Sequence, residues 1–511
     1  MPFLLAFIPI ALILFLMVGL RWGAARAGGA GYLSALLIAM LYFGAGPELI
    51  AYAHARALLL TADVLFIIWA AFLLFRVADE AGAIRTIGQA LPHLTADRGM
   101  QALIIGWVFA TFLQGVGGFG VPVAVIAPIL VGLGFTPLAA VLVPSIGHGW
   151  AVTFGSLGSS FLALMAATGL TWEVLAPYSA LFLALSGLLV GILVAHAAGG
   201  MSTVRRLLLP IFILWLFMGT VMYFVATYGL WNIASFSAGM AGLVVVLPLA
   251  GRFRGEMGEK GQMDGRALAV ALSGYAVLVV ITLAVQLIPP VRDYLGRLVV
   301  IGAEFPEVRT GLGYVVPAGP GRAIKLFSHA GAILTASSVL AYFIYLRAGL
   351  YRKGAAARIV NGTVTRVMSS SVSIAAMVTM AVIMEDAGMT DTLARGLAEG
   401  MGALYPAVAP WIGALGAFMT GSNTNSNVVF GALQQRTAEL LQFSVAIILA
   451  AQTAGAALAS VMAPTKVVVG ASTAGMAGNE GEVMRKLVAY TVILVLLISL
   501  FAGIAIWMTR G

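Results

Sequence analysis

Seven consecutive small polar residues, Gly-Ser-Asn-Thr-Asn-Ser-Asn at 421–427, interrupt an apolar run over 400–435 that has no charged residue. Their hydroxyl and amide groups can donate and accept hydrogen bonds, and helices that open at such a segment direct free N–H groups at an anion. We therefore expect a binding site for a small organic anion here. The alternative is a solvent-exposed turn, because charged residues follow soon after. The candidate ligands are Ser422, Asn423, Thr424 and Asn425.

A glycine-rich segment, Gly-Val-Gly-Gly-Phe-Gly at 115–120, lies in the other long charge-free run, 99–172. It has no polar side chain, so it could contact a ligand only through its backbone, which glycine leaves open to close approach. It does not fit a nucleotide-phosphate loop, because no strand precedes it and no Lys-Ser/Thr pair follows. The alternative is tight packing between helices. The candidate contacts are Gln114, Gly115, Gly117 and Gly118.

His148 and Lys466 are the two titratable residues that lie deep inside apolar segments next to these motifs. Ionisable residues inside a membrane are costly and usually functional. His148 could bind a carboxylate or carry a coupling proton, because its pKa lies near physiological pH; alternatively it is only hydrogen-bonded. Lys466 could attract an anion or extend its amine to the membrane surface. Gln452 and Thr453 are expected as polar partners in the same region.

Several kinds of chemistry lack their residues. There is no cysteine, so disulfides and thiolate sites are excluded. The sequence has no HExxH or GxSxG motif and no pair of deep carboxylates, so we expect no catalytic site, no metal and no cofactor. An enzyme that acts on lipid-linked substrates would have only His148 and Lys466 as deep acid or base groups.

The composition is that of a membrane protein. Of 511 residues, 61% are hydrophobic and 9% are charged, whereas soluble proteins have about 25% charged residues. The formal net charge of +9 is expected to reflect the orientation of loops in a bilayer and not a nucleic-acid surface.

Runs without charged residues predict an all-α polytopic protein, because a spanning helix needs about 20 apolar residues. We expect twelve spanning helices and two re-entrant hairpins that enter and leave the membrane on one side. The long run over 99–172 is divided into a hairpin at 99–135 and a broken helix at 137–168. Irregular backbone at membrane depth is tolerated only inside protein or beside a wet cavity, so these breaks are candidate sites.

The same order of features recurs 306 residues later, where Glu385-Asp386-Ala387-Gly388 matches Asp79-Glu80-Ala81-Gly82. A second hairpin at 400–437 and a second broken helix at 440–470 follow. For the acidic pairs we favour capping or gating over ion coupling. The predicted units are N-terminal helices over 1–56, a first repeat over 57–196, connecting helices over 197–366 with an outer loop at 289–328, and a second repeat over 367–511.

Loop charges predict the orientation. Inside loops contain 18 of the 28 lysines and arginines when the N-terminus is placed outside, as the positive-inside rule requires. Seven spans then separate corresponding helices, and this odd number makes the two repeats inverted. Inverted repeats with interrupted helices are typical of secondary transporters that work by alternating access. They favour a transporter with a binding site at the membrane midplane over a passive channel with a continuous pore.

The glycine segment with its continuation to Val125, the polar segment 421–427 and Gly478-Asn479-Glu480-Gly481-Glu482 resemble the bacterial lactate permease family. The resemblance extends over most of the chain. It implies proton-coupled uptake of lactate, glycolate and related short 2-hydroxy monocarboxylates across the bacterial inner membrane by a multi-pass protein. It leaves homo-oligomerisation open.

Three positions depart from the family pattern. Asn423 stands where the family usually has Asp, the residues Ile146 to Ala151 replace an Asn-Thr-Ala-Pro run, and Lys466 is an added cation. The site is thus more positive than usual. Either the proton-linked group has moved to His148, or the anion differs from lactate. A sodium-coupled transporter of another small organic anion is the alternative function.

Overall fold

The computed structural model describes residues 2–118, 120–253 and 264–510. Most of them are helical, and eleven helical segments are long and apolar enough to cross a membrane. One of these, Trp172–Phe253, is 82 residues long and is broken by non-helical backbone at Gly199 and Gly200, so it contains more than one crossing. The prediction of an all-α polytopic membrane protein is confirmed.

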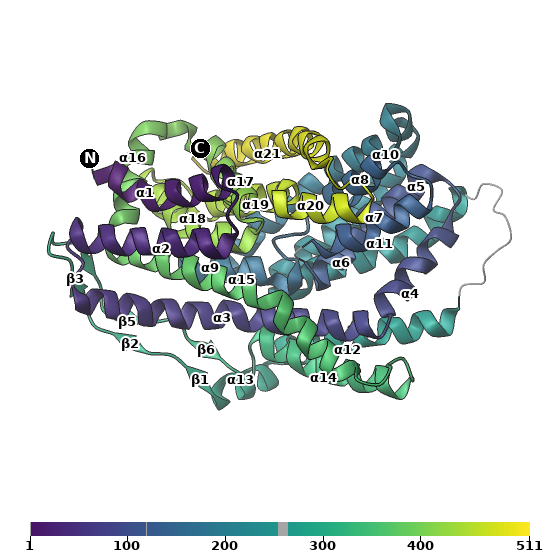
Figure 1. The fold of residues 1–511 in the computed structure, drawn as a ribbon, viewed down its shortest axis with the longest axis horizontal. Helices are drawn as coiled ribbons and strands as arrows, with labels where there is room; N and C mark the ends of the chain where they lie inside the picture. Colours follow the sequence, from purple (N-terminus) through teal and green to yellow (C-terminus); the bar gives the residue numbers. More distant parts are fainter. Residues whose placement is uncertain (1, 119, 254–263, 511) are drawn as a thin grey trace.

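Two long helices, α3 (Pro47–Glu80) and α15 (Ala355–Asp386), lie side by side along the molecule (Figure 1). They are antiparallel, because the start of each helix contacts the end of the other. Near the middle, the indole N–H of Trp69 donates to Ser371 Oγ at 3.0 Å. Both helices end at the matched Ala-Gly pairs, where Gly82 and Gly388 adopt positive φ, as is usual at helix C-termini.

A short helix, two hairpin arms joined by a turn, and a broken helix follow each of these long helices in the same order. In the first half the elements are α4 (Ala83–Ala90), α5 (Arg98–Leu103), α6 (Ala110–Val116), α7 (Val121–Gly132), α8 (Pro137–Gly149) and α9 (Ser159–Thr168). In the second half they are α16 (Met389–Met401), α17 (Tyr405–Thr420), α18 (Asn423–Leu440), α19 (Val445–Ala459) and α20 (Pro464–Thr473). The ends of α3 and α15 and the starts of α4 and α16 are each 306 residues apart.

These interrupted elements form the buried centre of the molecule. Residues 99–116 are all buried, and Val445–Met462 is 83% buried, whereas only 28% of Pro2–Gly19 is buried. The burial fits the rule that irregular backbone at membrane depth must be enclosed by protein.

The remaining helices surround this centre, with α12 and α14 together at one edge (Figure 1). They are α1 (Pro2–Leu14), α2 (Ala24–Leu41), α10 (Trp172–Val225), α11 (Ala234–Ala250), α12 (Gly265–Leu287), α14 (Ala330–Arg347) and α21 (Glu480–Arg510).

The predicted outer loop at 289–328 contains regular structure. It begins with the short helix α13 (Pro289–Leu298) and continues as a narrow antiparallel ribbon of three strand pairs. The pairs are β1 (Val300–Ile301) with β6 (Ile324–Lys325), β2 (Glu304–Phe305) with β5 (Gly319–Pro320), and β3 (Val308–Arg309) with β4 (Val315–Val316). Strand pairs this short are not detectable from residue alternation.

Candidate functional site

Each of the two hairpin turns has a glycine in close contact with a hydroxyl group of the broken helix in the same half. Gly118 has φ +60°, and a Cβ there would overlap Ser156 Oγ at the break between α8 and α9. Gly421 has φ +69°, and a Cβ there would lie 2.6 Å from Thr465 Oγ1 at the start of α20. The close approach and the positive φ both require glycine.

Other residues of the glycine segment have different surroundings. Gly115 packs against the backbone of Phe236 on α11, and Gly117 packs against Phe75 on α3. These two glycines therefore fit the packing alternative, whereas Gln114 lies against Gly155 at the break after α8. Phe119 lies outside the described residues.

The polar turn 421–427 is enclosed by protein. Ser422 caps α18, where its Oγ accepts a hydrogen bond from the Asn425 N–H at 3.3 Å. Asn423, Thr424 and Asn425 are each at most 4% exposed. The alternative of a solvent-exposed turn is therefore wrong.

Side chains from the two halves meet in one hydrogen-bonded network. Thr153 after α8 and Thr453 on α19 contact each other through their hydroxyls at 3.1 Å. The Asn423 amide donates to Thr153 Oγ1 at 3.1 Å, and the Asn427 amide donates to Thr453 Oγ1 and to the Ser160 carbonyl, each at 2.9 Å. These contacts place the start of α18 against the break of the opposite half.

Three members of this network, Thr153, Ser160 and Asn427, were not among the predicted site residues. Ser160 also contacts Thr424 through their hydroxyls at 3.0 Å. For Thr153 and Ser160 the available signal was the group of hydroxyl residues that follows His148 in the charge-free run, and Asn427 ends the polar segment 421–427. The residue pairing across the halves could not be read from it, because the partners are 264 to 300 positions apart.

Gln452 holds the second hairpin to α19. Its amide donates to Ser426 Oγ at 3.1 Å, and its Oε1 accepts from the Gln434 amide at 2.9 Å. The Tyr405 hydroxyl donates to Gln434 Oε1 at 2.6 Å. Both ends of the Gln452 amide are thus occupied by protein groups, so this residue positions the turn. Asn425 extends to the other side, where its amide donates to Ser373 Oγ on α15 at 3.1 Å.

Five buried side-chain atoms around the two turns are hydrogen-bond acceptors without a partner among the described residues. An unpaired buried acceptor costs about 1–3 kcal/mol. A ligand that brings hydroxyl or other donor groups would satisfy this set. The atoms are Gln114 Oε1, His148 Nε2, Asn423 Oδ1, Asn425 Oδ1 and Asn427 Oδ1.

His148 is fully buried and has a defined tautomer. Its Nδ1 lies 2.6 Å from the Pro144 carbonyl oxygen. Since a carbonyl can only accept, Nδ1 carries a proton, and the unpartnered Nε2 of the neutral ring is a proton acceptor.

Lys466 lies between the two turns. Its Nζ donates to Ser460 Oγ at 3.1 Å inside the protein, and only 9% of the residue is exposed. Its Cγ would lie 3.8 Å from a Cβ on Gly120, while the neighbouring Thr465 lies against Gly421. The alternative in which the amine extends to the membrane surface is therefore wrong. The Lys466 cation therefore lies where the two turns meet, beside Gly120 and Gly421, and we call this place the junction.

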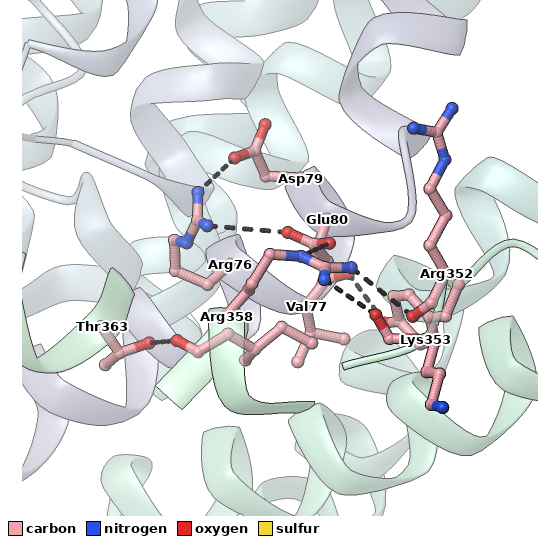
Figure 2. A network of polar contacts seen from close by, with 10 residues as sticks. Arg76, Val77, Asp79, Glu80, Arg352, Lys353, Arg358 and Thr363 are labelled. Atoms are coloured by element: carbon pink, nitrogen blue, oxygen red, sulfur yellow. Dashed lines mark hydrogen bonds and ion pairs between the residues drawn. The ribbon is translucent and has the colours of Figure 1, made fainter. Parts of the chain in front are cut away.

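The acidic pairs at the helix ends join α3 to α15. Figure 2 shows Arg76 of α3 and Arg358 of α15 converging on Glu80, with N···O distances of 3.8 and 2.7 Å. Arg76 also pairs with Asp79 at 2.6 Å. At the opposite end of the two helices, Arg56 pairs with Asp386 at 3.1 Å. These contacts fit the predicted role in capping or gating.

A cavity of about 670 Å³ opens at the Arg56 end of the helix pair. Its walls are α3, the end of α9, the end of α15 and the ribbon segment 314–323. Along α9, Ala166 at the cavity is six residues from Ser160 in the network, which is about 9 Å of helix. The cavity thus lies within two turns of α9 from the polar network.

Sequence comparisons match the chain to permeases. The L-lactate permease family profile matches residues 2–509. The chain is 26% identical to glycolate permease GlcA of Escherichia coli K12, over 99% of this chain and 96% of that protein. It is 25% identical to L-lactate permease of Bacillus subtilis, over 97% and 94%. The solved YdaH transporter of Alcanivorax borkumensis aligns with TM-score 0.48 and 14% identity, over 88% of this chain and 86% of that one.

Proposed function

The chain belongs to the L-lactate permease family, and from this premise we propose that it imports short 2-hydroxy monocarboxylates such as lactate or glycolate by proton symport and alternating access. The observation that carries the proposal is the junction at α20. There, Thr465 lies against the second turn and Lys466 lies against the first. A small anion at this point touches both halves of the protein.

The groups at the junction match the two ends of a 2-hydroxy acid. Lys466 supplies the positive charge for the carboxylate, and in the described part of the junction no acidic side chain opposes it. The unpartnered amide oxygens of Asn423 and Asn427, whose amide nitrogens donate to Thr153 and Thr453, accept the hydrogen bond of a hydroxyl group. A site built to bind a hydroxyl strongly rejects the analogue without it.

Alternating access is supported by matched contacts between the halves. In one, α18 of the second half packs on α9 of the first; in the other, α20 of the second half packs on α7 of the first. Each contact joins the second arm of a hairpin to the helix beyond the opposite break. Relative movement of such equivalent parts would expose a central site to each side in turn.

The cost of moving an anion against the membrane potential and the unpartnered Nε2 of His148 both favour coupling to a proton. Moving one anion into an inside-negative cell costs about 2.3 kcal/mol per 100 mV, and a co-transported proton removes this term. Asn423 cannot titrate, whereas His148 Nε2 is a buried, unpartnered acceptor. Protonated His148 and the carboxylate form a neutral unit, which separates when His148 loses its proton to the cytoplasm.

Sodium coupling is the second candidate, and one observation favours it. Two of the unpartnered acceptors are amide oxygens on the same side of a single helix start, at Asn423 and Asn427. Oxygen ligands near interrupted helices are the sites that bind Na⁺ in secondary transporters.

Uptake by the purified full-length protein in liposomes tests both proposals. With an inward proton gradient and no sodium, we expect accumulation of labelled lactate, and at least about 100-fold weaker competition by propionate than by lactate. Accumulation that requires a sodium gradient and does not change with the pH gradient would show that sodium, and not the proton, is the coupling ion. Equal competition by propionate would contradict the role of the hydroxyl.

A further inference from the structure

The predicted outer loop at 289–328 contains five basic residues, whereas the other outer loops have almost none. Two of the five form ion pairs outside α13. Arg309 pairs with Glu307 at 2.7 Å, and Arg322 pairs with Asp63 at 2.6 Å. The other three, which are Arg292, Arg297 and Lys325, line a single cavity of about 620 Å³.

This cavity, the α13 cleft, lies between α13, the end of α12 and the chain that leads into α14. Lys325 runs along α13, since a Cβ on Gly296 would lie 3.7 Å from Lys325 Cδ and 3.4 Å from Ser328 Oγ. The backbone of Lys325 is held by pairing with Val300 in the ribbon. The lining residues are Gln286, Arg292, Asp293, Gly296, Arg297, Val300, Lys325 and Ser328.

The cleft has an excess of positive charge. Asp293 is its one acidic lining residue, and it lies 3.5 Å from Arg292. Arg297 and Lys325 have no ion-pair partner in the part of the chain that the structure describes. Three cations against one acid leave a net charge of +2, which selects an anion. Arginine in particular offers the paired N–H groups that match a phosphate.

The position of the cleft is that of a membrane surface. It lies where the candidate spans α12 and α14 end and begin, at Leu287 and Ala330. None of the residues of α13 is buried, and its apolar Tyr294 and Leu298 are exposed, as are Ile288 and Val299 beside it. A short helix with exposed apolar and basic residues at the end of spanning helices is typical of the bilayer interface.

We propose that the α13 cleft binds the phosphodiester headgroup of an anionic phospholipid, with the acyl chains against the exposed apolar residues at its rim. Arg297 and Lys325 contact the phosphate oxygens, and Arg292 adds positive charge beside them. The proposal concerns a site separate from the junction of the two turns and does not depend on the transported anion.

Lipid binding to the full-length protein tests the proposal. The probe is phosphatidylglycerol added to detergent-purified protein and followed by native mass spectrometry, with phosphatidylcholine as the neutral lipid. We expect phosphatidylglycerol to bind more tightly than phosphatidylcholine. The double variant Arg297→Gln/Lys325→Gln should weaken phosphatidylglycerol binding about 20-fold. Arg309→Gln, an exposed arginine of the same loop outside the cleft, should change it less than twofold.

Four results would overturn the proposal. The first is equal affinity for the two lipids, and the second is unchanged phosphatidylglycerol binding in the double variant when its elution profile matches that of the wild type. The third concerns the source of the phosphate. If inorganic phosphate alone occupies the cleft as tightly as the lipid does, the site takes a free anion. A dimer that the double variant abolishes, with no effect on lipid binding, would show a second copy in the cleft instead.

Discussion

Arg358 of α15 donates a hydrogen bond to Glu80 of α3 at 2.7 Å, at the end of the helix pair opposite to the ion pair of Arg56 with Asp386. Glu80 and Asp386 are 306 residues apart and both end their helices. The two antiparallel helices are therefore joined at each end by an arginine of one and a matched carboxylate of the other. Such a pair of links can open at one end while the other holds.

The two links should differ in strength because their burial differs. The Arg56 and Asp386 side chains are 17% and 8% exposed, whereas Arg358 is 46% exposed. Arg56→Gln leaves a buried carboxylate without its cation and should destabilise the protein by about 3 kcal/mol. Arg358→Gln, the matched control, should cost less than about 1 kcal/mol. Unfolding of both variants in detergent measures this, and equal losses would contradict it.

Removing the Thr453 hydroxyl should damage the junction of the two halves. Thr453 Oγ1 accepts from the amide of Asn427 and contacts Thr153, so Thr453→Val leaves buried polar groups unpaired at about 1–3 kcal/mol. We expect substrate affinity to fall at least tenfold in counterflow assays. Thr282→Val is the control, since the buried Thr282 hydroxyl has no partner among the described residues. Similar affinities for the two variants would remove Thr453 from the site.

The sequence was sufficient for the membrane class, the family and the two polar or glycine-rich turns, because these depend on local composition. Asn423 and Thr424 were predicted from their types inside an apolar run. Gly115 shows the limit of this approach. Its type fits both ligand contact and packing, and only the distance to Phe236 decides between them.

Contacts between segments that are distant in the chain could not be predicted from the sequence. Lys466 had two open interpretations, because neither its spacing nor its neighbours show that Gly120, 346 positions earlier, lies beside it. Thr153 and Ser160 carried no motif and acquire significance only through Thr453 and Thr424. The ribbon over 300–325 consists of two-residue strands, too short for a period of two to appear.

Stability should depend on pH through Asp97. Burial alone would raise the pKa of Asp97, but hydrogen bonds from Arg206 and from the Met100 N–H hold the pKa below its ordinary value. The charged form therefore stabilises the folded state above about pH 4, and this contribution is lost as the pH falls through the lowered value. Asp97→Asn, which can still cap α5, should cost up to about 1 kcal/mol at pH 7.

The Asp97→Asn variant also tests the direction of this pH dependence. As the pH falls below about 4 and the wild-type carboxyl takes up its proton, the difference in thermal midpoint between wild type and Asp97→Asn should shrink. A difference that stays constant between pH 7 and pH 3 would show that the charge of Asp97 is not involved.

The predicted orientation can be measured directly, because the chain has no cysteine. Val300 is 51% exposed in the outer loop, and Ala356 is exposed at the start of α15, in a predicted inside loop. In intact cells an impermeant thiol reagent should label Val300→Cys and should label Ala356→Cys only after the cells are opened. Labelling of Ala356→Cys in intact cells would reverse the orientation and with it the assignment of the α13 cleft to the outer surface.

His148 and Lys466 have different proposed roles, so their variants should fail in different assays. If His148 Nε2 carries the proton, His148→Gln should still bind substrate and exchange it in counterflow, but should lose accumulation driven by an inward proton gradient. Lys466→Gln should lose the positive charge at the junction of the two turns and weaken substrate binding by about tenfold or more, since hydrogen bonds to charged groups contribute about 1.5–3 kcal/mol. If His148→Gln retains full proton-driven accumulation, His148 does not carry the proton. Asn423 cannot titrate, so Lys466 is then the remaining titratable group at the junction in the described residues.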